Sequence, residues 1–66
     1  MAESMEAFGI RVAESVRAAC VEAAQEAYER ARMDGVCDEG AWEVAVDIMR
    51  NLAVAPIIRS ATASHP

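Results

Sequence analysis

The feature that most constrains this 66-residue chain is the unequal length of its two helical segments. One helical pattern extends from about residue 4 to residue 34, and a second extends from about 39 to 53. At a rise of 1.5 Å per residue, the first helix is about 45 Å long and the second about 22 Å long. Folded against each other as an antiparallel hairpin, they leave half of the longer helix without a partner.

Composition and periodicity both favour the first helix. Glutamate, alanine and arginine dominate it, and all three are strong helix formers. Ser4 is a suitable N-cap, and Glu26 and Arg30 are spaced for an ion pair one turn apart. Gly9, Ala24 and Ala31 are expected at the flank of the apolar stripe. The residues expected in the stripe itself are Met5, Phe8, Val12, Val16, Ala19, Cys20, Ala23 and Ala27.

The segment Asp34-Gly35-Val36 predicts the end of the first helix. Gly35 can adopt the left-handed conformation, and Val36 can then fold back on the last turn. Asp38 follows as the expected N-cap of the second helix. Pro56 prevents a regular helix from continuing, so we expect an αα-hairpin domain over residues 1–55 and a C-terminal tail over 56–66.

The unpartnered half of the first helix carries the largest apolar side chains of its stripe. Leaving such side chains in water forfeits roughly 1.5–3 kcal/mol each. Residues 54–58 can cover part of them, but a second copy of the hairpin covers them more completely. The expected fold class is therefore all-α, a helical hairpin that dimerises into a four-helix bundle. The residues expected at the dimer or partner interface are Met5, Phe8, Val12, Val16, Ala19, Ala23 and Leu52.

Length and charge exclude several classes of function. The chain is too short for the common two-domain or barrel enzymes, and we expect a non-catalytic protein without a cofactor. Its net charge of −5 argues against binding to nucleic acid or to an anionic membrane. The first 15 residues lack a basic start followed by a long apolar stretch, which argues against a secretory signal. We therefore expect a cytoplasmic protein with reduced cysteines.

The two cysteines lie about 20 Å apart along the expected hairpin, which excludes a disulfide between them. Cys20 falls on the apolar stripe and is expected to pack as a small core residue. Cys37 lies in the loop before the second helix, where the helix dipole favours a thiolate and the neighbouring acids disfavour it. The candidate site at the hairpin tip comprises Cys37, Asp38, Glu39 and Trp42. Its alternatives are a thiol- or metal-binding module and a packed loop without chemistry.

Other residues that carry chemistry have simpler interpretations. The acidic residues around the loop match no calcium-binding loop, and helix capping accounts for them. The one histidine, His65, lies in the expected tail, so neither a di-iron site nor a nucleophile–histidine pair is expected. An acidic ridge of Glu22, Glu26 and Glu29 is either a solvated helix face or the contact surface of an acidic inhibitor that occupies a basic surface on another protein.

The two large aromatic residues near the loop, Tyr28 and Trp42, have two interpretations. Trp42, one turn into the second helix, is expected to anchor the hairpin by packing on the first helix. The alternative is a partner-facing residue, since tryptophan and tyrosine are enriched in binding hot spots. DNA recognition by a helix-turn-helix is excluded because the second helix begins with acidic residues.

The segment 35–43 has the pattern G-x-C-x-E-G-x-W-E. This pattern resembles that of very short uncharacterised bacterial helical proteins, some of which carry an acetyltransferase label that their length cannot justify. The resemblance implies a bacterial source and supplies no catalytic residues. It implies that the loop and the start of the second helix, around Cys37, Gly40 and Trp42, are the functional end of the hairpin. The leading expectation from the sequence is an interaction or accessory protein that forms a homodimer.

Overall fold

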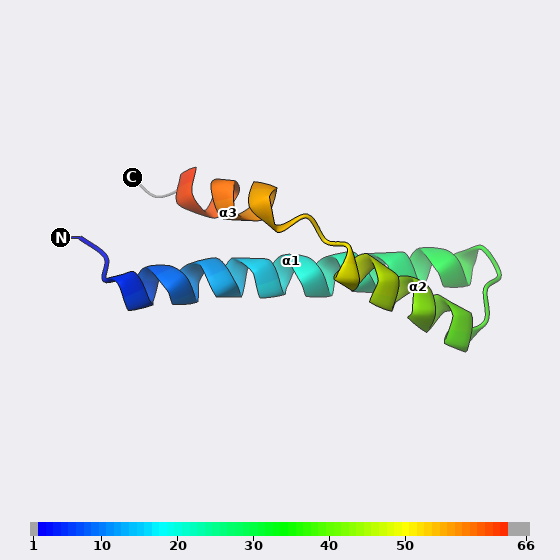
Figure 1. Cartoon of the computed structure of the whole chain (residues 1–66). Helices are drawn as coiled ribbons and strands as arrows, with labels where there is room; N and C mark the ends of the chain where they lie inside the picture. The colour runs from blue at the N-terminus through cyan, green and yellow to red at the C-terminus, as the bar shows by residue number, and fades with distance from the viewer. Residues whose placement is uncertain (1, 64–66) are drawn as a thin grey trace. The chain divides into compact units, whose positions relative to one another are not determined.

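The computed structural model describes residues 2–63, which form three α-helices and no strand (Figure 1). Helix α1 covers Met5–Met33, α2 covers Asp38–Arg50 and α3 covers Val54–Ala63. The all-α class expected from the sequence is confirmed. No helix in residues 2–63 has both the length and the apolar character needed to cross a membrane.

Helix α1 begins and ends where the sequence predicts. The hydroxyl of Ser4 accepts a hydrogen bond from the N–H of Ala7 at 3.0 Å, which is the expected N-cap. At the other end Gly35 has a φ of +92°. The N–H of Val36 donates to the carbonyl of Ala31 at 2.9 Å, and the N–H of Gly35 donates to the carbonyl of Arg32 at 3.0 Å. This pair of bonds is the Schellman motif, which requires a left-handed residue at the helix end.

The N-cap of α2 is Cys37, which corrects the expectation that Asp38 caps this helix. The Sγ of Cys37 accepts a hydrogen bond from the N–H of Gly40 at 3.4 Å. Asp38 is instead the first residue of the helix, and its carboxylate pairs with Arg32. A carboxylate in the first turn still complements the helix dipole, so the acid keeps its electrostatic role without being the cap.

Helix α2 ends at Arg50, three residues earlier than the sequence predicts. Asn51 is the C-cap, and its side-chain amide donates to the carbonyl of Asp47 at 2.8 Å and to the Asp47 carboxylate at 3.1 Å. The Asn51 side chain therefore hydrogen-bonds to the backbone of the last turn of α2. Residues 51–53 then form a short break before α3.

Helix α3 occupies most of the segment that the sequence predicts to be a tail. Pro56 is the third residue of this helix. Its missing N–H costs nothing there, because the first-turn N–H groups have no partner within the helix. Pro56 therefore lies in the first turn of a new helix instead of marking the beginning of irregular chain. His65, interpreted as a tail residue, lies outside the described residues.

The chain divides into two compact units. The hairpin unit is Cys20–Leu52, in which α2 folds back beside the C-terminal half of α1 (Figure 1). The buried hydrophobic residues of the described chain all lie in this unit, and they are Ala24, Ala31, Ala41 and Ala45. The sequence places two of these residues, Ala24 and Ala31, only at the flank of the apolar stripe of the first helix. Alanine at the contact lets two helix backbones approach closely, because helix separation depends on the side chains between them.

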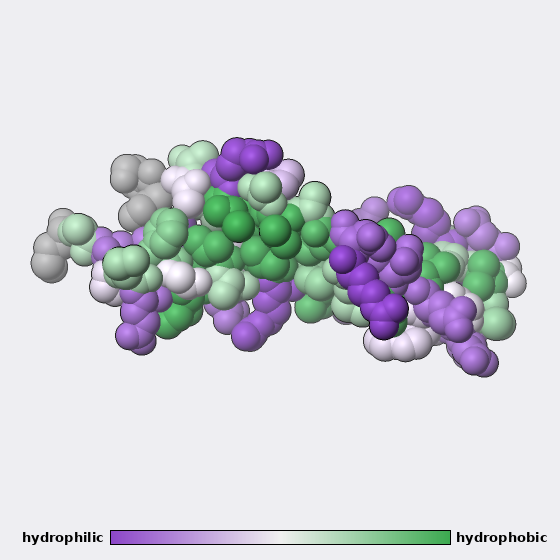
Figure 2. All heavy atoms as spheres, in the orientation of Figure 1, coloured by the Kyte–Doolittle hydropathy of each residue, from purple (hydrophilic) through white to green (hydrophobic). Residues whose placement is uncertain are grey.

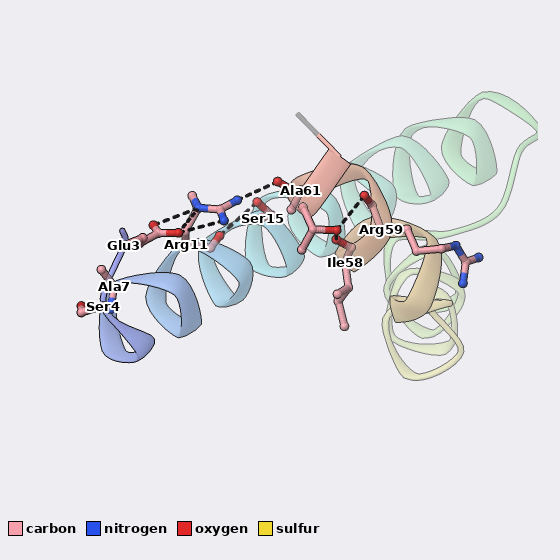
Figure 3. Close-up of polar contacts among 9 residues, drawn as sticks. Glu3, Ser4, Ala7, Arg11, Ser15, Ile58, Arg59 and Ala61 are labelled. Carbon is pink, nitrogen blue, oxygen red and sulfur yellow. Dashed lines mark hydrogen bonds and ion pairs between the residues drawn. The ribbon is translucent and has the colours of Figure 1, made fainter. Parts of the chain in front are cut away.

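The terminal unit comprises the described parts of 1–19 and 53–66, so that α3 packs on the N-terminal half of α1. Small and apolar residues line the junction, among them Ala19, Ile57 and Ala61. Arg11 crosses it and donates to the carbonyl of Ala61 at 2.6 Å (Figure 3). The same guanidinium pairs with Glu3 at 3.0 Å. Residues 54–58, which the sequence offers as a partial cover for the first helix, belong to α3 in this unit.

Candidate functional site

The hairpin unit contains a groove near the predicted tip. It lies between α1 and α2 and has a volume of about 450 Å³. The residues that line it are Ala24, Gln25, Tyr28, Glu29, Asp38, Trp42 and Ala45. Two of these seven, Asp38 and Trp42, belong to the site predicted from the sequence.

Small residues form the floor of the groove and aromatic residues form its walls. Ala24 and Ala45 are 9% and 1% exposed, whereas Trp42 is 58% exposed. Trp42 is therefore more exposed than the expectation that it anchors the hairpin by packing on the first helix implies. Its neighbour Ala41, which is fully buried, occupies the inward position, and the turn of the helix directs the indole away from it. An indole left in contact with water is typical of a surface that binds a partner.

The phenol of Tyr28 fixes one side of the groove. Its hydroxyl donates to Oδ1 of Asp38 at 3.1 Å, which connects α1 to the first residue of α2. This hydrogen bond is the main reason that the pKa of Tyr28 is raised from its ordinary value of 10.0. Partial burial and the negative charge of Asp38 raise it further, while Arg32 acts in the opposite direction.

Arg32 holds the loop beside the groove. Its Nε lies 3.0 Å from Oδ1 of Asp38, and its Nη1 donates to the carbonyl of Val36 at 3.0 Å. One guanidinium thus binds both the loop backbone and the start of α2. The sequence places Arg32 on the polar face of the first helix, and it gives no signal that this side chain reaches the loop.

Glu29 also lines the groove, and its carboxylate makes no hydrogen bond or ion pair within residues 2–63. It belongs to the predicted acidic ridge with Glu22 and Glu26, and all three are exposed. Glu26 pairs with Arg30 at 3.3 Å, as the spacing predicts. Of the three ridge carboxylates, Glu29 is the one that lines the groove.

The other residues of the predicted tip site do not join the groove. Cys37 is exposed, and its sulfur accepts the capping hydrogen bond from the N–H of Gly40. Glu39 is exposed on the first turn of α2. Residues 2–63 contain no group of three or more histidine, cysteine and acidic side chains that could hold a metal ion. Cys20, expected in the core, is only half-buried.

Local structure accounts for much of the pattern that the resemblance rests on. Gly35 supplies the positive φ of the turn, and Cys37 caps α2. A Cβ on Gly40 would lie 2.8 Å from Cγ1 of Val36 and 3.6 Å from the sulfur of Cys37. Glycine at this position therefore lets the loop pack closely on the first turn of α2.

The predicted interface residues lie in both units and remain incompletely covered. Met5 is 92% exposed and Phe8 is 41% exposed. The others are half-buried, and they are Val12, Val16, Ala19, Ala23 and Leu52. Ala23 and Leu52 belong to the hairpin unit and the rest to the terminal unit.

Comparison with protein-family models, with curated proteins and with solved structures finds no match to this chain.

Proposed function

We propose that this protein is a small, non-catalytic interaction protein that self-associates through its terminal unit. The observation that carries the proposal is the small size of the core. The buried hydrophobic residues of the described chain are four alanines, and none of its large side chains is fully buried. A domain this small gains at most ~3–5 kcal/mol from a single core even when that core contains large residues.

The surface offered for self-association combines the N-terminal half of α1 with α3. It includes Met5 and Phe8 from α1 and Val54 and Ile58 from α3, which are between 37% and 92% exposed. Hydrophobic residues also gather over this unit on the face that Figure 2 shows. Burial of apolar area contributes about 25 cal/mol per Å², so pairing two such surfaces supplies stability that one copy lacks.

Sedimentation equilibrium over a wide concentration range, with reductant present, tests the proposal. We expect a dimer. The variant Phe8→Glu places a charge on the proposed interface and should shift the dimer to monomer. The matched control is Ile10→Glu, because Ile10 is also exposed and lies two residues away on the opposite side of α1. A well-folded monomer at every concentration would exclude self-association.

The thiol- or metal-binding alternative at Cys37 is favoured by one observation, the exposure of its side chain in the loop. A reactive or ligating thiol predicts that Cys37→Ser changes thiol reactivity or bound metal, measured with a thiol reagent and by elemental analysis. Cys20→Ser serves as the comparison. If Cys37→Ser changes neither quantity beyond the loss of one ordinary thiol, the sulfur acts only as the cap of α2.

A further inference from the structure

We propose that the groove between α1 and α2 binds an amphipathic, arginine-bearing helix of another protein. This surface is separate from the one proposed for self-association. The groove residues belong to the hairpin unit, whereas Phe8 and the apolar surface around it belong to the terminal unit. Either proposal can therefore fail without the other.

The shape of the groove suits the apolar face of a helix. Its alanine floor lets an incoming side chain approach the backbones of α1 and α2, and Tyr28 and Trp42 contact that side chain from either wall. A volume of about 450 Å³ accommodates one or two large side chains. Helices that bind such grooves present apolar residues three or four positions apart, which matches a groove that runs between two helices.

The charge of the groove selects a basic partner. Glu29 and Asp38 line it, and no basic residue does. Arg32, the cation bound to Asp38, is also held by the loop carbonyl of Val36. An incoming guanidinium can stack on the indole face of Trp42 and pair with the carboxylate of Glu29. A second copy of this chain is a poorer occupant, because its net charge is −5.

The experiment uses the full chain and two synthetic helical probes. One is an amphipathic peptide of repeated heptads with leucine on one face and arginine beside it. The other replaces every arginine with glutamate. Binding is measured by the fluorescence anisotropy of labelled peptide at low and at physiological salt. We expect the arginine peptide to bind, its affinity to fall as salt screens the charges, and the glutamate peptide not to bind.

Variants separate groove binding from general attraction to an acidic protein. Trp42→Ala should weaken binding about tenfold or more, and Val44→Ala, an exposed residue of the same helix outside the groove, should leave it unchanged. Glu29→Gln should weaken it about threefold, and Glu6→Gln, which removes the same charge far from the groove in sequence, should not. Circular dichroism is used to check that each variant keeps its helices.

Three results would overturn the proposal. The first is that the arginine peptide does not bind. The second is an equal loss of affinity in Glu6→Gln and Glu29→Gln, which would mean that net charge alone attracts the peptide. The third is that Trp42→Ala converts a dimer to a monomer in sedimentation equilibrium, while the arginine peptide leaves the wild-type dimer intact. That result would assign the groove to a second copy of this chain.

Discussion

The hydroxyl of Tyr28 and the carboxylate of Asp38, 3.1 Å apart, join the two helices of the hairpin unit beside the loop that connects them. This hydrogen bond holds Tyr28, which forms a wall of the groove, next to Asp38 at the rim of the groove. It also leaves a measurable signature, because Tyr28 is the one tyrosine of the sequence.

We expect the phenol of Tyr28 to titrate above the ordinary pKa of 10.0 when the absorbance of tyrosinate is followed as pH rises. Asp38→Ala removes both the acceptor and the charge, so it should lower the pKa of Tyr28 toward the ordinary value. Glu39→Ala removes the neighbouring acid of the same helical turn and should change the titration little. A Tyr28 titration that is the same in wild type and Asp38→Ala would contradict the hydrogen bond.

The raised pKa of Tyr28 also determines how the stability of the fold changes with pH. A raised pKa means that the folded chain holds the phenolic proton more tightly than the unfolded chain. The contact therefore contributes its full stability below about pH 10 and loses it as pH rises through the pKa of the folded state. Denaturant midpoints measured on either side of this range should fall at alkaline pH more in wild type than in Asp38→Ala.

Two glycines should respond oppositely to alanine. Gly35 has a φ of +92°, so Gly35→Ala strains the turn and should cost about 1 kcal/mol of unfolding free energy. Gly9 lies inside α1, and a Cβ there meets no atom within 4 Å. Gly9→Ala should therefore add about 1 kcal/mol. Urea midpoints at one protein concentration measure both. A loss of stability at Gly9 would show that the position is not open.

The sequence predicts the positions that depend on local backbone chemistry. The Ser4 cap, the left-handed Gly35 and the ion pair of Glu26 with Arg30 each depend on residues within a few positions of one another. The sequence favours Asp38 over Cys37 as the cap of α2, because aspartate commonly caps a helix and cysteine seldom does. The sequence does not reveal α3, because a proline is compatible with the first turn of a helix as well as with irregular chain.

The groove depends on contacts that the sequence pattern does not encode. The stripe of the first helix predicts which face is apolar, but Ala24 and Ala31 are buried because their small size allows close packing. This close packing of the two helices also places Ala41 at their contact and Trp42 on the rim of the groove. Distances between helices decide such an outcome, and periodicity within one helix contains no information about them.

The alanine contact of the hairpin unit should tolerate little added volume. Ala41 is fully buried, so Ala41→Leu forces the two helices apart and should cost about 1–3 kcal/mol. Ala13 is exposed on α1, and Ala13→Leu should change stability by less than about 0.5 kcal/mol. Thermal unfolding followed by circular dichroism compares them. Equal stability of the two variants would mean that the helices are not in close contact at Ala41.

Arg11 should control the stability of α3. Its Nη1 donates to the Ala61 carbonyl in the last turn of α3, where the helix dipole favours a positive charge. Glu3 holds the same guanidinium at 3.0 Å, and its hydrogen bonds are the main reason that the pKa of Arg11 is raised. The guanidinium also lies 5.2 Å from the centre of the Phe8 ring.

We therefore expect Arg11→Ala to raise the hydrogen-exchange rates of the α3 amides while those of α2 stay unchanged. Arg17→Ala is the control, because Arg17 is exposed and pairs only with Glu14 among the described residues. Arg11→Lys keeps the positive charge but loses the planar fork that binds Glu3 and Ala61 together, so its effect should be intermediate. If α3 exchanges equally fast in wild type and Arg11→Ala, then the packing of residues such as Ile57 on α1 holds this helix without Arg11.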